Sequence, residues 1–272
     1  MKKWIQYGKE LQQEFQKDNV PLLGAAQAYY YLLAIFPMLI LIISVLPYLN
    51  FETQEVMEFV EQAIPGETAD LFKENIVSIV QDPKGGLLTI GILGTLWSAS
   101  GGINAFIKAS NIAYNVDEER SFIKVRLISI ALTLGMIVAI VVALVLPVFG
   151  DVLIEFLQNT LYLPEQTLIL FQVLRWAIGI LVMTGVLIAL YRYAPCKHLP
   201  IKDILPGALT TAVLWQLISL VFSFYVSNFA NYSATYGSLG GIIILMLWFF
   251  LTGIILMVGA EVNVIHNRRR KA

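Results

Sequence analysis

Six stretches of this chain are apolar over roughly twenty residues or more, and this length constrains the fold more than any other feature. They cover about residues 24–48, 86–107, 127–149, 167–194, 204–227 and 236–262. A helix of about 20 apolar residues crosses the hydrocarbon core of a bilayer, which is about 30 Å thick. Only 14% of the residues are charged, whereas soluble domains carry about 25%. We therefore predict an all-α, polytopic membrane protein with six transmembrane helices in a single domain, residues 1–272.

Two further segments are predicted to lie outside the bilayer. Residues 1–22 combine an apolar helix face with lysines that can reach lipid headgroups, so we expect an amphipathic helix on the cytoplasmic membrane surface, ended by Pro21. Residues 50–85 show helical periodicity on both sides of Pro65-Gly66 and carry eight acidic residues but only two lysines. We expect an amphipathic helical hairpin there, between the first and second spans. Its acidic surface is interpreted as a solvated face, and a docking site for an envelope protein is the alternative.

The distribution of lysine and arginine orients the spans. Four of these residues lie before the first span, four in residues 108–126, three in 191–203 and four in 268–271, against two in 50–85. Short loops rich in lysine and arginine stay on the cytoplasmic side of a membrane. We therefore place both termini in the cytoplasm and the hairpin outside. The single cysteine, Cys196, is then cytoplasmic.

The second span carries small and polar residues that a lipid-facing helix does not need. They recur at spacings of three and four residues, which places them on one helix face. They are Gly94, Trp97, Gly101, Asn104, Lys108 and Asn111. Small residues let a neighbouring helix approach closely, and side-chain amides bond across helices. We interpret the stripe as a polar seam in the centre of the bundle; plain helix packing with a lysine reaching the interface is the alternative.

Pro37 lies in the middle of the first span. A proline inside a helix removes one backbone hydrogen bond and commonly produces a kink. Membrane helices tolerate such a position where neighbouring groups satisfy the freed carbonyl. We predict a kink at Pro37, and the sequence leaves open whether its role is structural or functional.

Glu261 ends the sixth span at the cytoplasmic level. Four cations are expected at a similar depth, and they are Lys108, Arg120, Arg126 and Arg192. We predict that Glu261 pairs with one of them and closes the cytoplasmic end of the bundle. An ordinary interfacial salt bridge and a gating contact that breaks during transport both fit this prediction.

Arg175 is the one charged residue that we place near the middle of the membrane, about 12 Å along the fourth span. An arginine at the bilayer centre costs roughly 2.5–3.5 kcal/mol on insertion scales, so it favours a bundle interior or a water-filled cavity. Gln172 shares its helix face. Four residues from the outer half of the membrane are expected to line the site around Arg175, and they are Ser44, Tyr225, Asn228 and Tyr236. We predict that Arg175 binds the anionic headgroup of a substrate; the alternative is an arginine that snorkels to carbonyls or lipid phosphates.

Several motifs resemble, in the same order, those of the YihY/BrkB family of bacterial inner-membrane proteins. They are Ala25–Pro37, Trp97–Ser100, Asn111–Tyr114, Arg120–Phe122, Leu190–Pro195, Pro206–Leu209, Tyr236–Gly240 and Gly259–Glu261. The chain departs from the family pattern at Ala34, where a small hydroxylated residue is expected. The resemblance implies a six-helix, multi-pass protein of the bacterial inner membrane. The family has carried a ribonuclease label and has been linked to envelope lipid transport and serum resistance.

Catalytic patterns are weak in this sequence. Metal-dependent RNA hydrolysis needs clustered His, Asp or Glu side chains, but His198 and His266 are each alone near a helix end. We find no nucleotide-binding or Ser/His/Asp pattern, and the net charge of −1 offers no basic footprint for nucleic acid. We expect no enzymatic activity, metal, cofactor or nucleic-acid partner.

The remaining function classes are transport and scaffolding. We predict a transporter or flippase that is not driven by ATP, with membrane lipids as partners and an anionic, lipid-like substrate. The polar stripe of the second span, the proline in the first span and Arg175 favour this prediction. The alternative is a membrane scaffold or assembly factor with no transport pathway.

Overall fold

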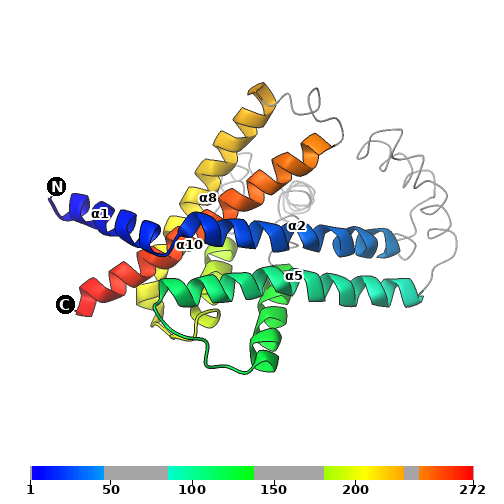
Figure 1. Cartoon of the computed structure of the whole chain (residues 1–272), viewed down its shortest axis with the longest axis horizontal. Coiled ribbons are helices and arrows are strands. Elements are labelled where there is room, and N and C mark those ends of the chain that lie inside the picture. Colours follow the sequence, from blue (N-terminus) through cyan, green and yellow to red (C-terminus); the bar gives the residue numbers. More distant parts are fainter. Residues whose placement is uncertain (1, 46–84, 138–180, 230–238, 272) are drawn as a thin grey trace, which may run out of the picture.

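The computed structural model of the chain describes residues 2–45, 85–137, 181–229 and 239–271, and every regular element in these residues is an α-helix. The labelled helices are α1 (Lys2–Lys17), α2 (Val20–Val45), α5 (Gly85–Ala113), α8 (Ile201–Phe229) and α10 (Leu239–Lys271) (Figure 1). Two further helical stretches cover residues 122–137 and 181–193. The prediction of an all-α protein is confirmed for the described residues.

Three of these helices are long and apolar enough to cross a membrane. They are Thr89–Ala113, Ile201–Val226 and Gly240–Lys271, which fall on the second, fifth and sixth predicted spans. The shorter apolar helices Val20–Ile35 and Leu181–Tyr193 fall on the first and fourth. The third predicted span begins within the helical residues 122–137. The count of six spans remains a prediction, and the hairpin predicted for residues 50–85 lies, except for its last residue, outside the described residues.

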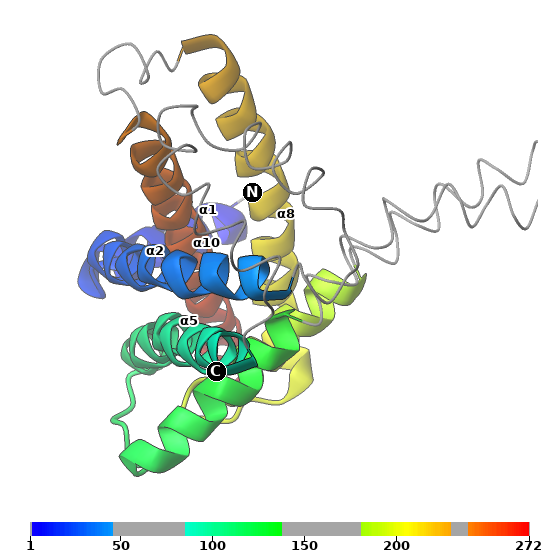
Figure 2. The same ribbon diagram turned by 90° about the vertical axis from the view of Figure 1, so that its right-hand side faces the viewer.

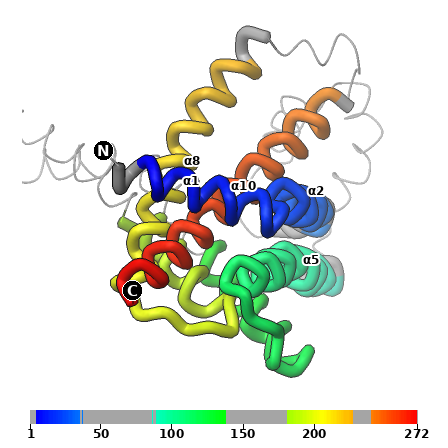
Figure 3. The backbone as a smooth tube through the Cα atoms, turned by 60° about the vertical axis from the view of Figure 1, so that its left-hand side comes forward, coloured from blue at the N-terminus to red at the C-terminus, as the bar shows by residue number. Residues whose placement is uncertain are grey.

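The described helices pack around α2 and α10. Helices α2 and α5 lie side by side and run in opposite directions, and α10 packs against both α2 and α8 (Figures 1 and 2). Both chain termini lie at the same end of the molecule, where α1 runs beside the last turns of α10 (Figure 3). Lys17 bonds Asn115, and Arg270 bonds Asp203. The four basic segments therefore gather at one end, as expected if they share one side of a membrane.

Glycines allow α10 to approach its neighbours closely. A methyl group added at Gly207 of α8 would overlap the carbonyl oxygen of Gly259 in α10. A methyl group added at Gly253 of α10 would lie 2.8 Å from the carbonyl oxygen of Gly24 in α2. In a membrane, where lipid is as apolar as any side chain, such close backbone packing is a main source of helix association.

A buried tyrosine adds a polar link between three helical segments. Tyr191 is fully buried, its hydroxyl lies 2.7 Å from the hydroxyl of Thr211 in α8, and it donates a hydrogen bond of 2.7 Å to the carbonyl of Leu256 in α10. The ring also packs against Phe106 of α5, at 5.9 Å between ring centroids. A buried hydroxyl without partners would cost free energy, so these bonds favour one arrangement of the helices.

The first helix ends earlier than predicted. It stops at Lys17, and the chain turns at Asn19, whose φ of 51° is one that asparagine adopts more readily than most residues. Pro21 lies in the first turn of α2, where a missing backbone N–H costs nothing. The prediction that Pro21 ends the first helix is therefore wrong. Helix α1 packs on α10, with the Tyr7 hydroxyl donating to the carbonyl of Val262 at 3.2 Å.

Candidate functional site

One face of α1 is acidic and meets the basic end of α10. Glu10, Glu14 and Asp18 follow one another at intervals of four residues, which places them on the same helix face. Arg269 donates two hydrogen bonds to Glu10, of 2.9 and 3.0 Å, and the guanidinium of Arg268 lies 2.8 Å from Glu14. The hydrogen bonds from Arg269 hold the pKa of Glu10 below its ordinary value. These ion pairs fix α1 against α10.

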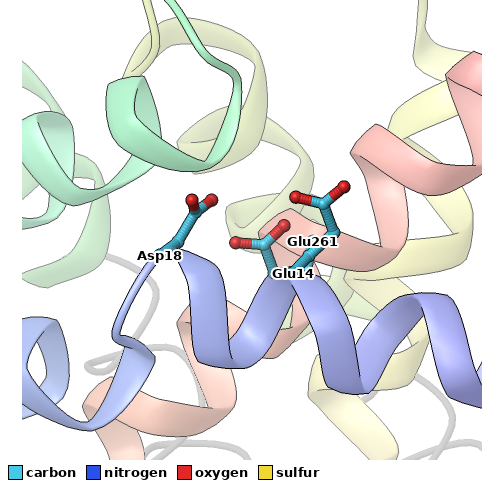
Figure 4. Close-up of side chains that lie close together, drawn as sticks. All are labelled: Glu14, Asp18 and Glu261. Carbon is cyan, nitrogen blue, oxygen red and sulfur yellow. The ribbon is translucent and has the colours of Figure 1, made fainter.

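Three carboxylates come together where these helices meet, and we name them the acidic cluster: Glu14, Asp18 and Glu261 (Figure 4). Each contributes one oxygen to a group in which all three oxygens lie within 4.8 Å of one another. Glu14 and Asp18 are each 8% exposed and Glu261 is 0% exposed. The ammonium group of Lys17 lies 3.1 Å from Glu14 and 3.7 Å from Asp18.

The charges of the acidic cluster are only partly compensated. Within the described part of the chain, both carboxylate oxygens of Glu261 and one oxygen of Asp18 have no hydrogen-bond partner. Burial of Glu14 opposes its ionisation, but hydrogen bonds from Arg268 and Lys17 outweigh burial and lower the pKa of Glu14. Two cations therefore face three carboxylates, and Glu261 is left without a partner of its own.

A basic pocket of about 450 Å³ lies beside the acidic cluster. Four cations line it, together with Tyr114, Asn115 and Asn267, and they are Lys17, Lys197, Arg268 and Lys271. Lys17 and Arg268 also contact Glu14, so they belong to both sites. Lys197 and Lys271 form no ion pair among the described residues. The pocket therefore carries positive charge that no neighbouring carboxylate offsets.

A hydrogen-bond network holds together the two loops beside this pocket. Asn111 donates to Glu118 at 2.9 Å and accepts from the backbone N–H of Cys196 at 2.8 Å. Arg120 donates to both carboxylate oxygens of Glu118 and to the carbonyl of Ala194, at 2.7 to 2.8 Å. The hydrogen bond from Arg120 lowers the pKa of Glu118 to about 2. The network thereby fixes the loop that carries Lys197.

The prediction that Glu261 pairs with one of four cations is wrong, because none of the four forms an ion pair with it in the described residues. Arg120 binds Glu118, and Arg192 donates to the carbonyl of Leu199. Arg126 donates to the carbonyl of Trp97 and lies over its ring, while Lys108 is exposed. Glu261 instead faces the acidic end of α1. The proposed roles of these residues in closing the cytoplasmic end remain predictions.

The stripe on the second span is only partly a contact between helices. A methyl group added at Gly101 would lie 3.2 Å from the ring of Tyr30, and one added at Gly94 would lie 3.6 Å from Pro37, both in α2. Asn111 is buried in the loop network, and Asn104 is half-buried. Trp97, in contrast, is 61% exposed. Helix α2 continues through Pro37 to Val45, and a kink there remains a prediction.

The outer binding site predicted around Arg175 falls largely outside the described residues. Arg175, Gln172 and Tyr236 lie outside them, and so do the side chains of Ser44 and Asn228, although their backbones belong to α2 and α8. Tyr225 lies in α8 and is 38% exposed. Sequence reasoning missed the acidic cluster and the basic pocket. The four-residue spacing of acids in α1 was the available signal for the cluster.

Comparisons with known proteins agree with the motifs. A model of the family described as virulence factor BrkB matches residues 11–272. The chain is 42% identical to the putative ribonuclease-like protein YfkH of Bacillus subtilis, over 97% of this chain and 96% of that protein. It is 25% identical to a UPF0761 membrane protein of Photobacterium profundum, over 100% of this chain and 84% of that protein. No solved structure matches the chain.

The family assignment rests on both sequence similarity and helix length. The family model covers nearly the whole chain, and a relative of almost equal length is 42% identical. The helices of membrane-spanning length fit relatives that are named as membrane proteins. The chain belongs to the BrkB family of membrane proteins.

Proposed function

We propose that this protein is a multi-pass transporter or flippase of the bacterial inner membrane that moves an anionic, lipid-like molecule without ATP hydrolysis. The observation that carries the proposal is the basic pocket, in which Lys17, Lys197, Arg268 and Lys271 surround about 450 Å³. Its lining residues Lys17, Lys197 and Arg268 lie at the end of α10 where the basic segments gather. The distribution of lysine and arginine assigns this end to the cytoplasm.

The chemistry of the pocket favours a negatively charged headgroup. Lysine and arginine bind phosphate and carboxylate groups through charge-assisted hydrogen bonds. Lys197 and Lys271 are exposed and carry no ion pair in the described part of the chain, so an anion would gain their charge without breaking a salt bridge. Pockets for small ligands commonly enclose about 300–1,000 Å³. Arg175, predicted near the middle of the membrane, would supply a second anion site along the same pathway.

A ribonuclease is the alternative that the name of the Bacillus subtilis relative raises. Metal-dependent RNA cleavage requires carboxylates that a phosphodiester can reach. The carboxylates of the acidic cluster are at most 8% exposed, which disfavours contact with a polynucleotide. Purified protein should therefore not cleave RNA in Mg²⁺ or Mn²⁺. Cleavage that copurifies with the protein and stops with EDTA would overturn this expectation.

Reconstitution into vesicles tests transport directly. Vesicles should contain the protein and a trace of fluorescent phosphatidylglycerol, or of a zwitterionic phosphatidylcholine with the same chains and fluorophore. We expect phosphatidylglycerol from the inner leaflet to become accessible to an external quencher faster than in protein-free vesicles. The increase in this rate should be larger for phosphatidylglycerol than for phosphatidylcholine. A scaffold without a pathway predicts rates equal to those of protein-free vesicles, and this result would contradict the proposal.

A further inference from the structure

We propose that Glu14, Asp18 and Glu261 form a binding site for a hard divalent cation of the Ca²⁺, Mn²⁺ and Mg²⁺ class. No metal is expected from the sequence, because His198 and His266 are each alone and Cys196 is the single cysteine. The fold brings the three acids together from the end of α1 and from α10 (Figure 4). Carboxylate oxygens are the ligands that such cations prefer.

Glu261 provides an observation that does not depend on clustering alone. Its side chain is 0% exposed and one of its oxygens lies within 4.8 Å of oxygens of Glu14 and Asp18, yet neither carboxylate oxygen has a hydrogen-bond partner among the described residues. Buried carboxylates are normally paired, hydrogen-bonded or bound to metal. Asp18, which follows α1, also has a buried carboxylate oxygen without a hydrogen-bond partner in the described residues. A cation between Glu261 and Asp18 would satisfy both.

The spacing of the oxygens indicates the size of the ion. All three candidate oxygens lie within 4.8 Å of one another. Ca²⁺ binds oxygen at about 2.3–2.6 Å, so two of its ligands can be as far apart as about 5 Å. Mg²⁺ binds at about 2.0–2.1 Å and requires its ligands to approach to about 4.2 Å or less. The upper limit of 4.8 Å falls inside the range for Ca²⁺ and outside that for Mg²⁺, so the spacing favours the larger ion.

Cation binding would also change the neighbouring basic pocket. Lys17 and Arg268 now neutralise Glu14, and both side chains are about half exposed, at 54% and 53%. A divalent cation would repel them and replace them as the counter-charge of Glu14. Both side chains already line the pocket, so they would become available to an anion there. This consequence rests on the proposed function, whereas the cation site does not.

Metal titration of purified, EDTA-treated full-length protein tests the site. Calorimetry with Ca²⁺, and electron paramagnetic resonance of Mn²⁺, should each show one saturable site. We expect Glu261→Gln and Asp18→Asn to weaken binding by at least about tenfold, since each replaces a charged carboxylate ligand with a neutral amide. Glu10→Gln is the matched control, because Glu10 lies one turn earlier on α1 and also pairs with an arginine of α10. It should change affinity by less than about twofold, as exposed ion pairs contribute little.

Thermal unfolding separates loss of the site from loss of the fold. Ca²⁺ should raise the unfolding temperature of the wild-type protein and of Glu10→Gln, but not that of Glu261→Gln. Without metal, Glu261→Gln should be at least as stable as the wild type, because a neutral amide replaces a buried carboxyl group that lies beside two other carboxylates. Absence of saturable binding in the wild type, or equal binding in Glu261→Gln, would overturn the cation site. Lipid transport that persists in either case would leave the proposed function intact.

Discussion

At the residue scale, Asn111 connects the helix α5 to two loops with one amide group. Its side chain is buried and bonds both the Glu118 carboxylate and the backbone N–H of Cys196. The resemblance motifs and the helical spacing both single out this residue in the sequence. They could not identify its partners, because Cys196 is 85 residues away in the chain. Contacts at such separations depend on how the helices pack.

Replacing Asn111 with alanine should lower the free energy of unfolding by about 1–3 kcal/mol, because the partly buried N–H of Cys196 loses its acceptor. The measurement is denaturant unfolding in detergent micelles, with the same probe for each variant. Asn104→Ala is the control on the same helix, since the Asn104 side chain forms no hydrogen bond within the described residues. An equal loss in both variants would show that helix packing, and not the hydrogen bonds, is responsible.

The ion pair of Glu118 with Arg120 predicts a dependence on pH. The pKa of Glu118 is about 2 in the folded protein, against an ordinary value of 4.5, chiefly because Arg120 hydrogen-bonds to its carboxylate. A lowered pKa in the folded state means that the stabilisation is complete above pH 4.5 and is lost as the pH falls toward 2. As the pH falls from 4.5 toward 2, the unfolding temperature of the wild type should therefore approach that of Glu118→Gln. Parallel curves over the whole window would contradict the assignment.

At the scale of helices, the sequence predicts most of the described elements. Apolar length locates the helices, and the basic loops identify which helix ends should lie together. The end of α1 and its docking on α10 were not predictable in the same way. The apolar face and the lysines of residues 1–22 predict a helix on the membrane surface, and this prediction takes no account of the acidic residues. The acidic face of α1, with Glu10 and Glu14, matches the arginines at the end of α10, and this long-range charge match is the missing part.

The close crossing of α8 and α10 yields a second stability prediction. Gly259→Ala should destabilise the protein by about 1–3 kcal/mol, as expected for overpacking, because the added methyl group would meet the buried hydroxyls of Thr211 and Tyr191. Gly241→Ala is a control on the same helix, where no atom lies within 4 Å of the added group. Thermal unfolding in detergent measures both. Equal effects of the two substitutions would contradict the close contact of Gly259 with Thr211 and Tyr191.

At the scale of the whole molecule, the sequence predicts the class of protein and the family, but it does not predict the candidate sites. The acidic cluster joins Glu14 and Asp18 to Glu261, and no local pattern links the two ends of the chain. The basic pocket likewise joins Lys17, Lys197 and Lys271 from three separate segments. Each lysine alone resembles an ordinary interfacial residue. The three lysines line one pocket because the fold brings their segments to the same end of the molecule.

The same gathering predicts that Cys196 is accessible from the cytoplasm. A membrane-impermeant thiol reagent should label it in inverted vesicles, or after permeabilisation, but not in intact cells. Ser78→Cys in a Cys196→Ser background is the matched control, because residues 50–85 are predicted to lie on the extracytoplasmic side of the membrane. This variant should label in intact cells. The reverse pattern for the two cysteines would overturn the predicted orientation.

The central claim is that the basic pocket binds the anionic headgroup of a transported lipid. Its most direct test compares two double variants in the vesicle assay: Lys197→Gln with Lys271→Gln, inside the pocket, and Lys9→Gln with Lys202→Gln, exposed near the same end but outside it. Both remove two positive charges, so general attraction to anionic lipid falls equally. We predict that the pocket variant slows phosphatidylglycerol movement by at least about tenfold, which corresponds to about 1.4 kcal/mol, while the control keeps the wild-type rate. Equal rates in the two variants would contradict the account.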